Sequence, residues 1–374
     1  MRVAIVHDWF KIEGGAESVV TSLLHIYPNA DFFSLVDFFS DEQRKRILSD
    51  KKVTYTFIQR LPFAKKYFQH YLFLFPLAIE RLDLRQYDLV ISSSHAVAKG
   101  VLTGPEQLHI CYCHTPMRYA WDMYFSYKEE HQINGFKERF LFYVLHKIRV
   151  WDVISSNRVD HFIANSSFVQ KRIKKYYRRE SSVIHPPVDA HRFQLNEKKE
   201  DFYFTASRLV PYKKIKMIVD AFVKNGKRLI VAGGGADLKE IESMATENIT
   251  VLGHISDEKM IELMKKARAF VFAAQEDFGI IPVEAMMCGT PIIAYSKGGI
   301  KDTMIDGITG VLYDEQTESS LNSAIKKFEE SSFDHKAIAQ YASSFSNERF
   351  EQEVKTFIDE KWSAFEKANI LHKG

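Results

Sequence analysis

The chain has 374 residues, more than one hydrophobic core usually serves, so two domains are expected. Its 46% apolar and 26% charged residues are typical of a globular protein and exclude a disordered or collagen-like chain. The net charge of +3 is too balanced to indicate a nucleic-acid binder, although residues 1–195 carry 27 basic and 20 acidic side chains and the remainder 24 and 28.

Short apolar runs alternate with helical patterns along most of the chain. The predicted strands are residues 3–6, 89–92, 109–113 and 160–164, then 202–206, 228–232, 249–252, 269–273 and 291–294. The predicted helices include residues 17–26, 214–223, 257–266 and 319–328. Residues 115–158 interrupt the alternation with many aromatic residues in helical patterns. Such alternation predicts parallel sheets covered on both faces.

The Pro186-Pro187 pair predicts a domain linker near residues 184–196, because no helix can run through it. We therefore predict an α/β protein of two doubly wound, Rossmann-like domains, residues 1–190 and 191–350, that face an interdomain cleft. Residues 351–374 are expected to form a final helix, and one arrangement that we consider is that this helix crosses back to the N-terminal domain. In such sheets ligands bind at the carboxyl ends of the strands.

The cysteines and the hydropathy pattern predict the compartment. Cys111, Cys113 and Cys288 are too few for a disulfide framework, which favours a reducing environment. The N-terminus MRVAIVHDWF reads as a strand, so no signal peptide is expected. No uncharged apolar window of about 18 residues occurs, so no membrane-spanning helix is expected. These features predict a cytoplasmic protein.

A first motif, Gly14-Gly15 with Glu17, follows the first predicted strand and its loop. Two glycines that open a helix let backbone N–H groups approach an anion at the positive helix end. The alternative is an ordinary turn with a helix cap. The dinucleotide fingerprint G-x-G-x-x-G is absent here, which weakens the case for a nicotinamide enzyme.

A second motif places Arg208 and Lys213 between the strand at 202–206 and the next helix. Two cations at the carboxyl end of a strand can hold a diphosphate, Arg as a bidentate fork and Lys as a point charge. The alternative is a solvated basic loop.

A third motif, AAQEDFGIIPVEAMMCGTP at residues 273–291, follows a predicted strand. Pro282 suits a first helical turn and Gly289 a helix end, so Glu276 is expected on the loop and Glu284 in the first turn of a short helix. A carboxylate accepts two hydroxyl hydrogen bonds, which suits the diols of sugars and ribose. Favourable pairing with the helix dipole is the alternative for Glu284.

Together these motifs resemble glycosyltransferase family 4, the retaining nucleotide-sugar transferases of GT-B fold. The resemblance covers most of the chain and is strongest over residues 202–312. The matching positions include the E-x7-E pair Glu276 and Glu284, the Arg-x4-Lys pair, Gly14-Gly15-x-Glu17, Gly233-Gly234-Gly235, Gly298-Gly299 and Asp306-Gly307-x-x-Gly310. Lys214 departs from the pattern, because many relatives have Gly there.

The resemblance implies a role for each matching residue. The N-terminal domain would bind the acceptor and the C-terminal domain the nucleotide sugar. Arg208 and Lys213 would neutralise the donor diphosphate, and Glu284 would hold the ribose hydroxyls. The transferred sugar would be oriented by Glu276 and by the backbone of Phe278, Gly279 and Ile280. The backbone N–H of Gly15, which follows Gly14, would donate a hydrogen bond to the donor phosphates. His114 matches a family histidine near the donor sugar; a structural strand-end histidine is the alternative. The nucleobase would lie near Gly253, His254 and Ile255.

No metal or other cofactor is expected. The sequence contains no D-x-D, H-E-x-x-H or C-x-x-C motif, so neither a carboxylate metal cradle nor a zinc site has support. Fixed cations and N–H groups would instead stabilise the charge that develops on the departing diphosphate. The resemblance therefore implies catalytic roles for Glu276, His114, Arg208 and Lys213, with Glu276 as a positioning group rather than a nucleophile.

The donor predicted by resemblance is GDP-mannose. His7-Asp8-Trp9 and residues 113–122 look like bacterial mannosyltransferases of O-antigen and exopolysaccharide assembly, whose acceptors are commonly lipid-linked saccharides. A UDP-sugar-dependent transferase is the competitor. An epimerase of nucleotide sugars with the same fold and a non-catalytic nucleotide-sugar binder are the rival functions.

The basic N-terminal half also predicts a membrane surface. Residues 57–79, 136–151 and 168–179 combine aromatic with basic residues, as do helices that lie on anionic bilayers. The six basic residues expected to bind lipid headgroups are Lys171, Arg172, Lys174, Lys175, Arg178 and Arg179. Ordinary core aromatics with a solvated basic face are the alternative. The predicted location is peripheral, on the inner face of the cell membrane.

Overall fold

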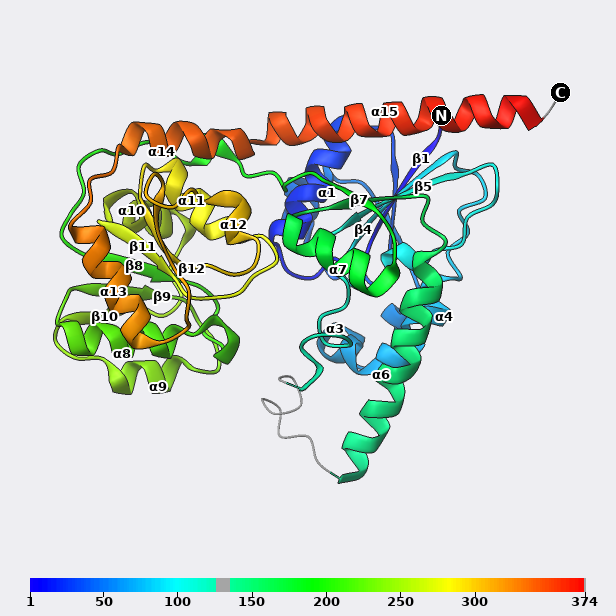
Figure 1. Ribbon diagram of the computed structural model, residues 1–374. Helices are drawn as coiled ribbons and strands as arrows, with labels where there is room; N and C mark the ends of the chain where they lie inside the picture. The colour runs from blue at the N-terminus through cyan, green and yellow to red at the C-terminus, as the bar shows by residue number, and fades with distance from the viewer. Residues whose placement is uncertain (126–134, 373–374) are drawn as a thin grey trace. The chain divides into compact units, whose positions relative to one another are not determined.

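The computed structural model describes residues 1–125 and 135–372 and divides into two compact units (Figure 1). Unit 1 comprises Met1–Pro187 and Glu348–Gly374, and unit 2 comprises Val188–Asn347. Both boundaries lie three residues before the predicted ones. The final helix, α15 (Asn347–His372), begins four residues before the predicted segment, and all but its first residue belongs to unit 1.

Unit 1 is built on seven parallel strands in the order β3-β2-β1-β4-β5-β6-β7. These are β1 (Val3–His7), β2 (Asp31–Ser34), β3 (Val53–Tyr55), β4 (Leu89–Ser94), β5 (Leu108–Cys113), β6 (His161–Ala164) and β7 (Ser181–Val183). The helices are α1 (Gly15–Ile26), α2 (Asp41–Leu48), η1 (Phe57–Arg60), α3 (Ala64–Tyr67), η2 (Phe68–Leu74), α4 (Phe75–Ile79), η3 (Ala98–Gly100), α6 (Gly135–Ser156), α7 (Ser167–Tyr177) and α15.

The unit 1 sheet is covered on both faces because alternate strand residues point to opposite sides. Ala4 and Val6 pack in a core with residues of η2, α4 and α6. Val3 and Ile5 pack on the other side with α1 and with residues of α15. The two faces of β1 therefore belong to two separate hydrophobic cores.

Residues 57–79, the first of the aromatic and basic segments, do not form one continuous helix. They form four short turns of helix, η1, α3, η2 and α4, rather than one element. The left-handed Phe63 (φ 55°) precedes α3, and Pro76 stands in the first turn of α4, so no single helix can span the segment.

Unit 2 is built on six parallel strands in the order β10-β9-β8-β11-β12-β13. These are β8 (Tyr203–Ala206), β9 (Leu229–Ala232), β10 (Ile249–Val251), β11 (Ala269–Phe272), β12 (Ile292–Tyr295) and β13 (Gly310–Tyr313). The helices are η4 (Ala190–Arg192), η5 (Pro211–Lys213), α8 (Ile215–Asn225), α9 (Leu238–Met244), α10 (Asp257–Lys266), α11 (Ile280–Met287), α12 (Ile300–Thr303), α13 (Glu318–Glu329), α14 (His335–Ala342) and η6 (Ser343–Phe345).

Each sheet reverses its strand order at one point. In unit 2 the chain runs outward from β8 through β9 to β10 and then returns to pair β11 on the other side of β8. In unit 1 the same reversal occurs between β1 and β4. The prediction of two doubly wound, Rossmann-like α/β domains is therefore confirmed. The loops at these reversal points part in opposite directions and leave room for a ligand.

Candidate active site

In unit 2 the second and third sequence motifs follow the two strands of the reversal point. Arg208 and Lys213 follow β8, while Glu276 follows β11. Lys213 Nζ forms an ion pair with Glu276 Oε1, and the two side chains are 13% and 22% exposed. Arg208 is exposed, and its guanidinium lies 3.4 Å from the hydroxyl of Tyr212. The structure thus brings the two loops into direct contact, with a further cation on the β8 loop.

The loop after β8 lies close to the end of β9, and glycine allows this approach. A Cβ atom on Gly233 would fall 1.8 Å from the carbonyl oxygen of Ser207, and one on Gly235 would fall 2.2 Å from that of Leu209. Both glycines also have positive φ, 132° and 158°. The sequence showed this glycine run as a motif, and the structure gives its physical reason.

Glycine also fixes the backbone of Glu276. The residue forms an isolated parallel bridge with Gly298, and Gly299 N–H donates to the Glu276 carbonyl oxygen at 2.9 Å. A Cβ atom on Gly298 would lie 2.3 Å from that same carbonyl oxygen. Gly298 and Gly299 therefore hold the loop that carries Glu276, a role that the sequence did not reveal.

Helix α11 begins earlier than expected, which moves Glu284. Gly279 adopts the left-handed conformation (φ 89°) that precedes the helix, and Ile280 is its first residue. Glu284 is then the fifth helical residue, so its expected place in the first turn is wrong. The Phe278 side chain is buried against Phe345, 5.9 Å between ring centres.

The pKa of Glu284 is raised from its usual 4.5 to about 7, chiefly by burial; Arg192 opposes this shift and Asp257 adds to it. Arg192 and Asp257 are themselves paired at 2.8 Å. In the ligand-free protein this carboxyl is therefore about half protonated near neutral pH. Hydroxyl groups that donate to the carboxylate would favour its ionised form.

The residues expected near the nucleobase lie at the end of β10, beside β9. Gly253 has φ 64° and its carbonyl oxygen accepts from Gly233 N–H at 2.7 Å. His254 is exposed, whereas Ile255 is packed against the core. This loop is therefore tied to the same glycine run that supports Arg208.

In unit 1 the first motif opens α1, as predicted. Gly14 is the capping residue in extended conformation, and Gly15 is the first helical residue. Glu17, in the first turn, is buried and points back to β1, where its Oε1 lies 3.4 Å from His7 Nε2. The helix N-terminus thus follows the strand next to the reversal point.

His114 lies just after β5, within a group of polar side chains from β1, β4 and α1. Its Nε2 is 2.8 Å from Ser93 Oγ. Burial lowers the pKa of His114 well below its usual 6.5, and the neighbouring His95 and His7 lower it further. His114 is therefore neutral at neutral pH.

Asp8 holds the turn after β4 in place. Its two oxygens accept from the backbone N–H groups of four successive residues at 2.5–2.9 Å, namely His95, Ala96, Val97 and Ala98. Trp9 packs edge-on against His95, 4.5 Å between ring centres. Sequence reasoning used His7-Asp8-Trp9 only as a resemblance and missed Ser93. The sequence feature that could have indicated these residues is a buried apolar strand that ends in polar residues.

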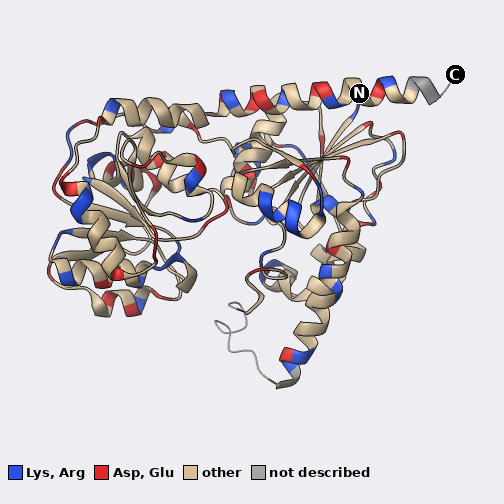
Figure 2. Cartoon of the chain, viewed as in Figure 1, with Lys and Arg blue, Asp and Glu red and all other residues tan. Residues whose placement is uncertain are grey.

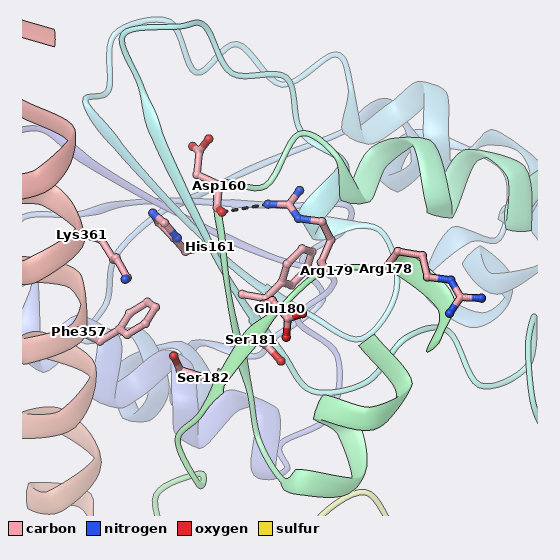
Figure 3. Close-up of a pocket in the computed structure, with 10 residues that line it drawn as sticks. Asp160, His161, Arg178, Arg179, Glu180, Ser181, Ser182, Phe357 and Lys361 are labelled. Atoms are coloured by element: carbon pink, nitrogen blue, oxygen red, sulfur yellow. Dashed lines mark hydrogen bonds between the residues drawn. The ribbon is translucent and has the colours of Figure 1, made fainter. Parts of the chain in front are cut away.

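One cavity of about 420 Å³ lies elsewhere in unit 1 (Figure 3). Its walls include Asp160 and His161 at the start of β6, Ser181 at the start of β7, and Phe357 and Lys361 of α15. Arg179 in this wall donates to the Asp160 carbonyl oxygen at 3.0 Å. The cavity is thus at the amino ends of the strands, the opposite edge from His114.

Within the described parts of the chain, no cluster of three His, Cys, Asp or Glu side chains could bind a metal ion. Nor is any helix in residues 1–125 or 135–372 long and apolar enough to cross a membrane.

Three of the six basic residues predicted to face lipid have partners within unit 1, and one of them, Arg172, is buried, so the predicted patch is wrong at that position. Arg172 is only 5% exposed and pairs with Asp122 at 2.5 Å. Arg179 donates to backbone carbonyl groups, and Lys174 pairs with Glu180. Lys171, Lys175 and Arg178 are exposed on or next to α7, and Figure 2 shows the basic residues on this helix.

Comparisons with known proteins follow the same division of the chain. Residues 13–192 match the family described as Glycosyltransferase Family 4, and residues 187–345 match Glycosyl transferases group 1. The chain is 30% identical over 193 residues to the O-antigen chain mannosyltransferase RfbU of Salmonella typhimurium, covering 47% of this chain and 53% of that protein. It is 27% identical over 171 residues to an uncharacterized glycosyltransferase of Methanocaldococcus jannaschii, covering 44% and 48%. The matches thus span about half the length of these curated relatives.

A solved structure shares the fold over nearly the whole chain. Anabaena Alr3699/HepE in complex with UDP aligns with a TM-score of 0.70 at 17% identity, covering 96% of this chain and 100% of that one. At this identity the likeness is one of fold.

Proposed function

The chain belongs to glycosyltransferase family 4, and on that premise we propose that it transfers a hexose from a nucleotide sugar to an acceptor hydroxyl with retention of anomeric configuration. The observation that carries the proposal is the contact between two loops at the unit 2 reversal point, where Lys213 meets Glu276 beside Arg208. A diphosphate and a sugar need these two kinds of groups, cations and a carboxylate, at one place.

The proposed chemistry is electrostatic. Cleavage of the bond between the anomeric carbon and the diphosphate leaves negative charge on the departing phosphate oxygen. Arg208 and Lys213 stabilise this charge in the transition state more than in the ground state, which lowers the barrier. Glu276 orients the sugar, and Glu284 accepts hydrogen bonds from the ribose diol.

GDP-mannose is the proposed donor. It is supported by His7-Asp8-Trp9 and residues 113–122, and by the likeness to a mannosyltransferase. A UDP-hexose is the second candidate, since the structural neighbour was captured with UDP. A thermal-shift panel of GDP, UDP and ADP with their sugars distinguishes the two. Stabilisation by UDP and its sugars alone would refute GDP-mannose.

Transfer itself is tested with the donor that the panel selects and a lipid-linked saccharide, the proposed acceptor. NMR of the product should show the donor's anomeric configuration, and inversion would contradict the assignment. Release of a free epimer without acceptor would identify an epimerase, and binding without turnover a nucleotide-sugar binder. Activity should persist in EDTA, because the two cations take the place of a metal ion; loss restored by Mn²⁺ or Mg²⁺ would contradict this.

We also propose that unit 1 rests on the inner face of the cell membrane, through exposed apolar residues rather than through the α7 basic residues alone. Phe63 is 80% exposed beside Lys65 and Lys66, and Phe140, Phe142 and Tyr143 of α6 are more than half exposed. Aromatic side chains with basic neighbours are typical of proteins that bind anionic bilayers.

Liposome sedimentation tests this surface. Replacing Phe140, Phe142 and Tyr143 by Ser should reduce binding to anionic liposomes at both low and high salt. The matched control carries Ser at Ile305 and Ile308, two exposed apolar residues of unit 2, and should bind as the wild type does. Equal binding by all three proteins, or binding by none, would contradict the proposal.

A further inference from the structure

A chain of four buried or partly buried polar side chains leads from α1 to His114. Glu17 Oε1 lies 3.4 Å from His7 Nε2, His7 Nδ1 lies 3.1 Å from Ser93 Oγ, and Ser93 Oγ lies 2.8 Å from His114 Nε2. His7 and Ser93 are register partners on the neighbouring strands β1 and β4, and both are fully buried. Each of these three contacts needs one proton, so the chain has a direction.

The direction follows from the carboxylate, which only accepts hydrogen bonds. His7 must then donate to Glu17 from Nε2. A neutral imidazole has one donor and one acceptor, so His7 Nδ1 accepts from the Ser93 hydroxyl. The single proton of Ser93 is used in that bond, and Ser93 Oγ therefore accepts from His114 Nε2–H.

We propose that Glu17, His7 and Ser93 are positioning residues that hold His114 as the Nε2–H tautomer, so that its Nδ1 is a hydrogen-bond acceptor for a sugar hydroxyl. This inference rests on the proposed function for its ligand, though not for its geometry. An acceptor nitrogen recognises a group that donates a proton, such as a hydroxyl, and finds no complement in an anionic phosphate oxygen.

The direction given above is that of a chain in which both histidine rings are neutral. His7 is fully buried and packs 4.9 Å from the Phe10 ring. The pKa of His114 is lowered, as described above. Further titratable neighbours are Asp8 and His95, which contact each other at 3.1 Å, and Tyr112, whose ring packs edge-on against His114 with 5.1 Å between ring centres. A doubly protonated His7 would reverse the chain and place the proton of His114 on Nδ1.

The tautomer of His114 can be measured directly in the ligand-free protein. Two-bond ¹H–¹⁵N correlation spectra of protein with labelled histidine distinguish the protonated ring nitrogen from the bare one. The chain has 14 histidines, so His114→Gln identifies the signals of His114 by their absence. We expect a proton on Nε2 and a bare Nδ1. A proton on Nδ1, or on both nitrogens, would overturn the proposal.

A matched pair of variants tests the part played by Ser93. Ser92, the preceding residue of β4, also contacts a buried histidine, His109 Nε2 at 2.8 Å, and it points to the other face of the sheet. Ser93→Ala should expose the Nε2–H of His114 to rapid exchange with water and lower kcat/KM about tenfold, the loss of one or two hydrogen bonds. Ser92→Ala loses an equivalent bond but should keep kcat/KM within about twofold of the wild type.

The outcomes separate the two proposals. The spectrum needs no donor, so it tests the tautomer even if transfer is never detected. If Ser93→Ala proves too unstable to purify, the wild-type spectrum alone still decides. Equal losses of kcat/KM in Ser92→Ala and Ser93→Ala would mean that Ser93 acts only through stability, and would refute its positioning role.

Discussion

The two units place chemically different groups at the same topological position. In unit 2 the loops at the reversal point present charge, with exposed Arg208 and the partly exposed pair of Lys213 and Glu276. In unit 1 the corresponding polar groups are buried and already bonded to each other, with Asp8 and Ser93 fully buried. Unit 2 is thus suited to stabilise charge, whereas unit 1 is suited to hold neutral groups in fixed orientation.

The largest effect should come from removing a cation of unit 2. Lys213→Ala should lower kcat about 100- to 1,000-fold, because Lys213 would act on charge that grows in the transition state. Steady-state kinetics measure this loss. The control is Lys216→Ala on α8, which breaks a lysine–glutamate pair with Glu240 of α9 and should leave kcat unchanged. A fully active Lys213→Ala enzyme would mean that the diphosphate lies elsewhere.

Glu284→Ala should weaken nucleotide binding about ten- to a hundredfold, the value of hydrogen bonds to a charged group. Affinity should also fall as the pH drops through about 7, because the raised pKa protonates the acceptor. Calorimetric titration between pH 6 and pH 8 tests both statements. Glu284→Gln should bind weakly without this pH dependence; the same pH dependence in that variant would assign it to another group.

The same shift has a consequence for stability. The pKa of Glu284 is about 7 in the folded protein, whereas its usual value is 4.5. The protonated carboxyl therefore stabilises the fold fully below pH 4.5, and this stabilisation is lost as the pH rises through 7. Between pH 5 and pH 8 the free energy of unfolding of the wild type should therefore fall by about 3 kcal/mol at most relative to that of Glu284→Gln. Urea unfolding at both pH values measures this difference. No change in the difference would show that the carboxyl is ionised throughout.

Much of the unit 2 site could be predicted because its residues follow strong apolar strands. Arg208 and Glu276 come directly after β8 and β11, both fully buried runs. The prediction missed β2, β3, β7 and β13. Of these, β3 and β7 are edge strands of three residues with little buried surface and thus no apolar run. Ser93 was missed because its partners come from register across strands, which a single sequence does not show.

The smallest effect concerns the departure from the family pattern at Lys214. This residue has φ 58°, a conformation that costs a side-chain-bearing residue free energy and that glycine adopts readily. Lys214→Gly should therefore stabilise the protein by about 0.5–1 kcal/mol, measured by urea unfolding, and leave kcat unchanged. If Lys214→Gly were less stable than the wild type, the Lys214 side chain would stabilise the fold by more than the left-handed backbone conformation destabilises it.

The central claim is that Arg208 and Lys213 hold the donor diphosphate. Calorimetric titration of the wild type, Arg208→Ala and Lys213→Ala with one nucleoside diphosphate and its monophosphate tests it most directly, without any acceptor. The wild type should bind the diphosphate at least about tenfold more tightly, and this preference should largely disappear in both variants. An unchanged preference in both variants would contradict the account.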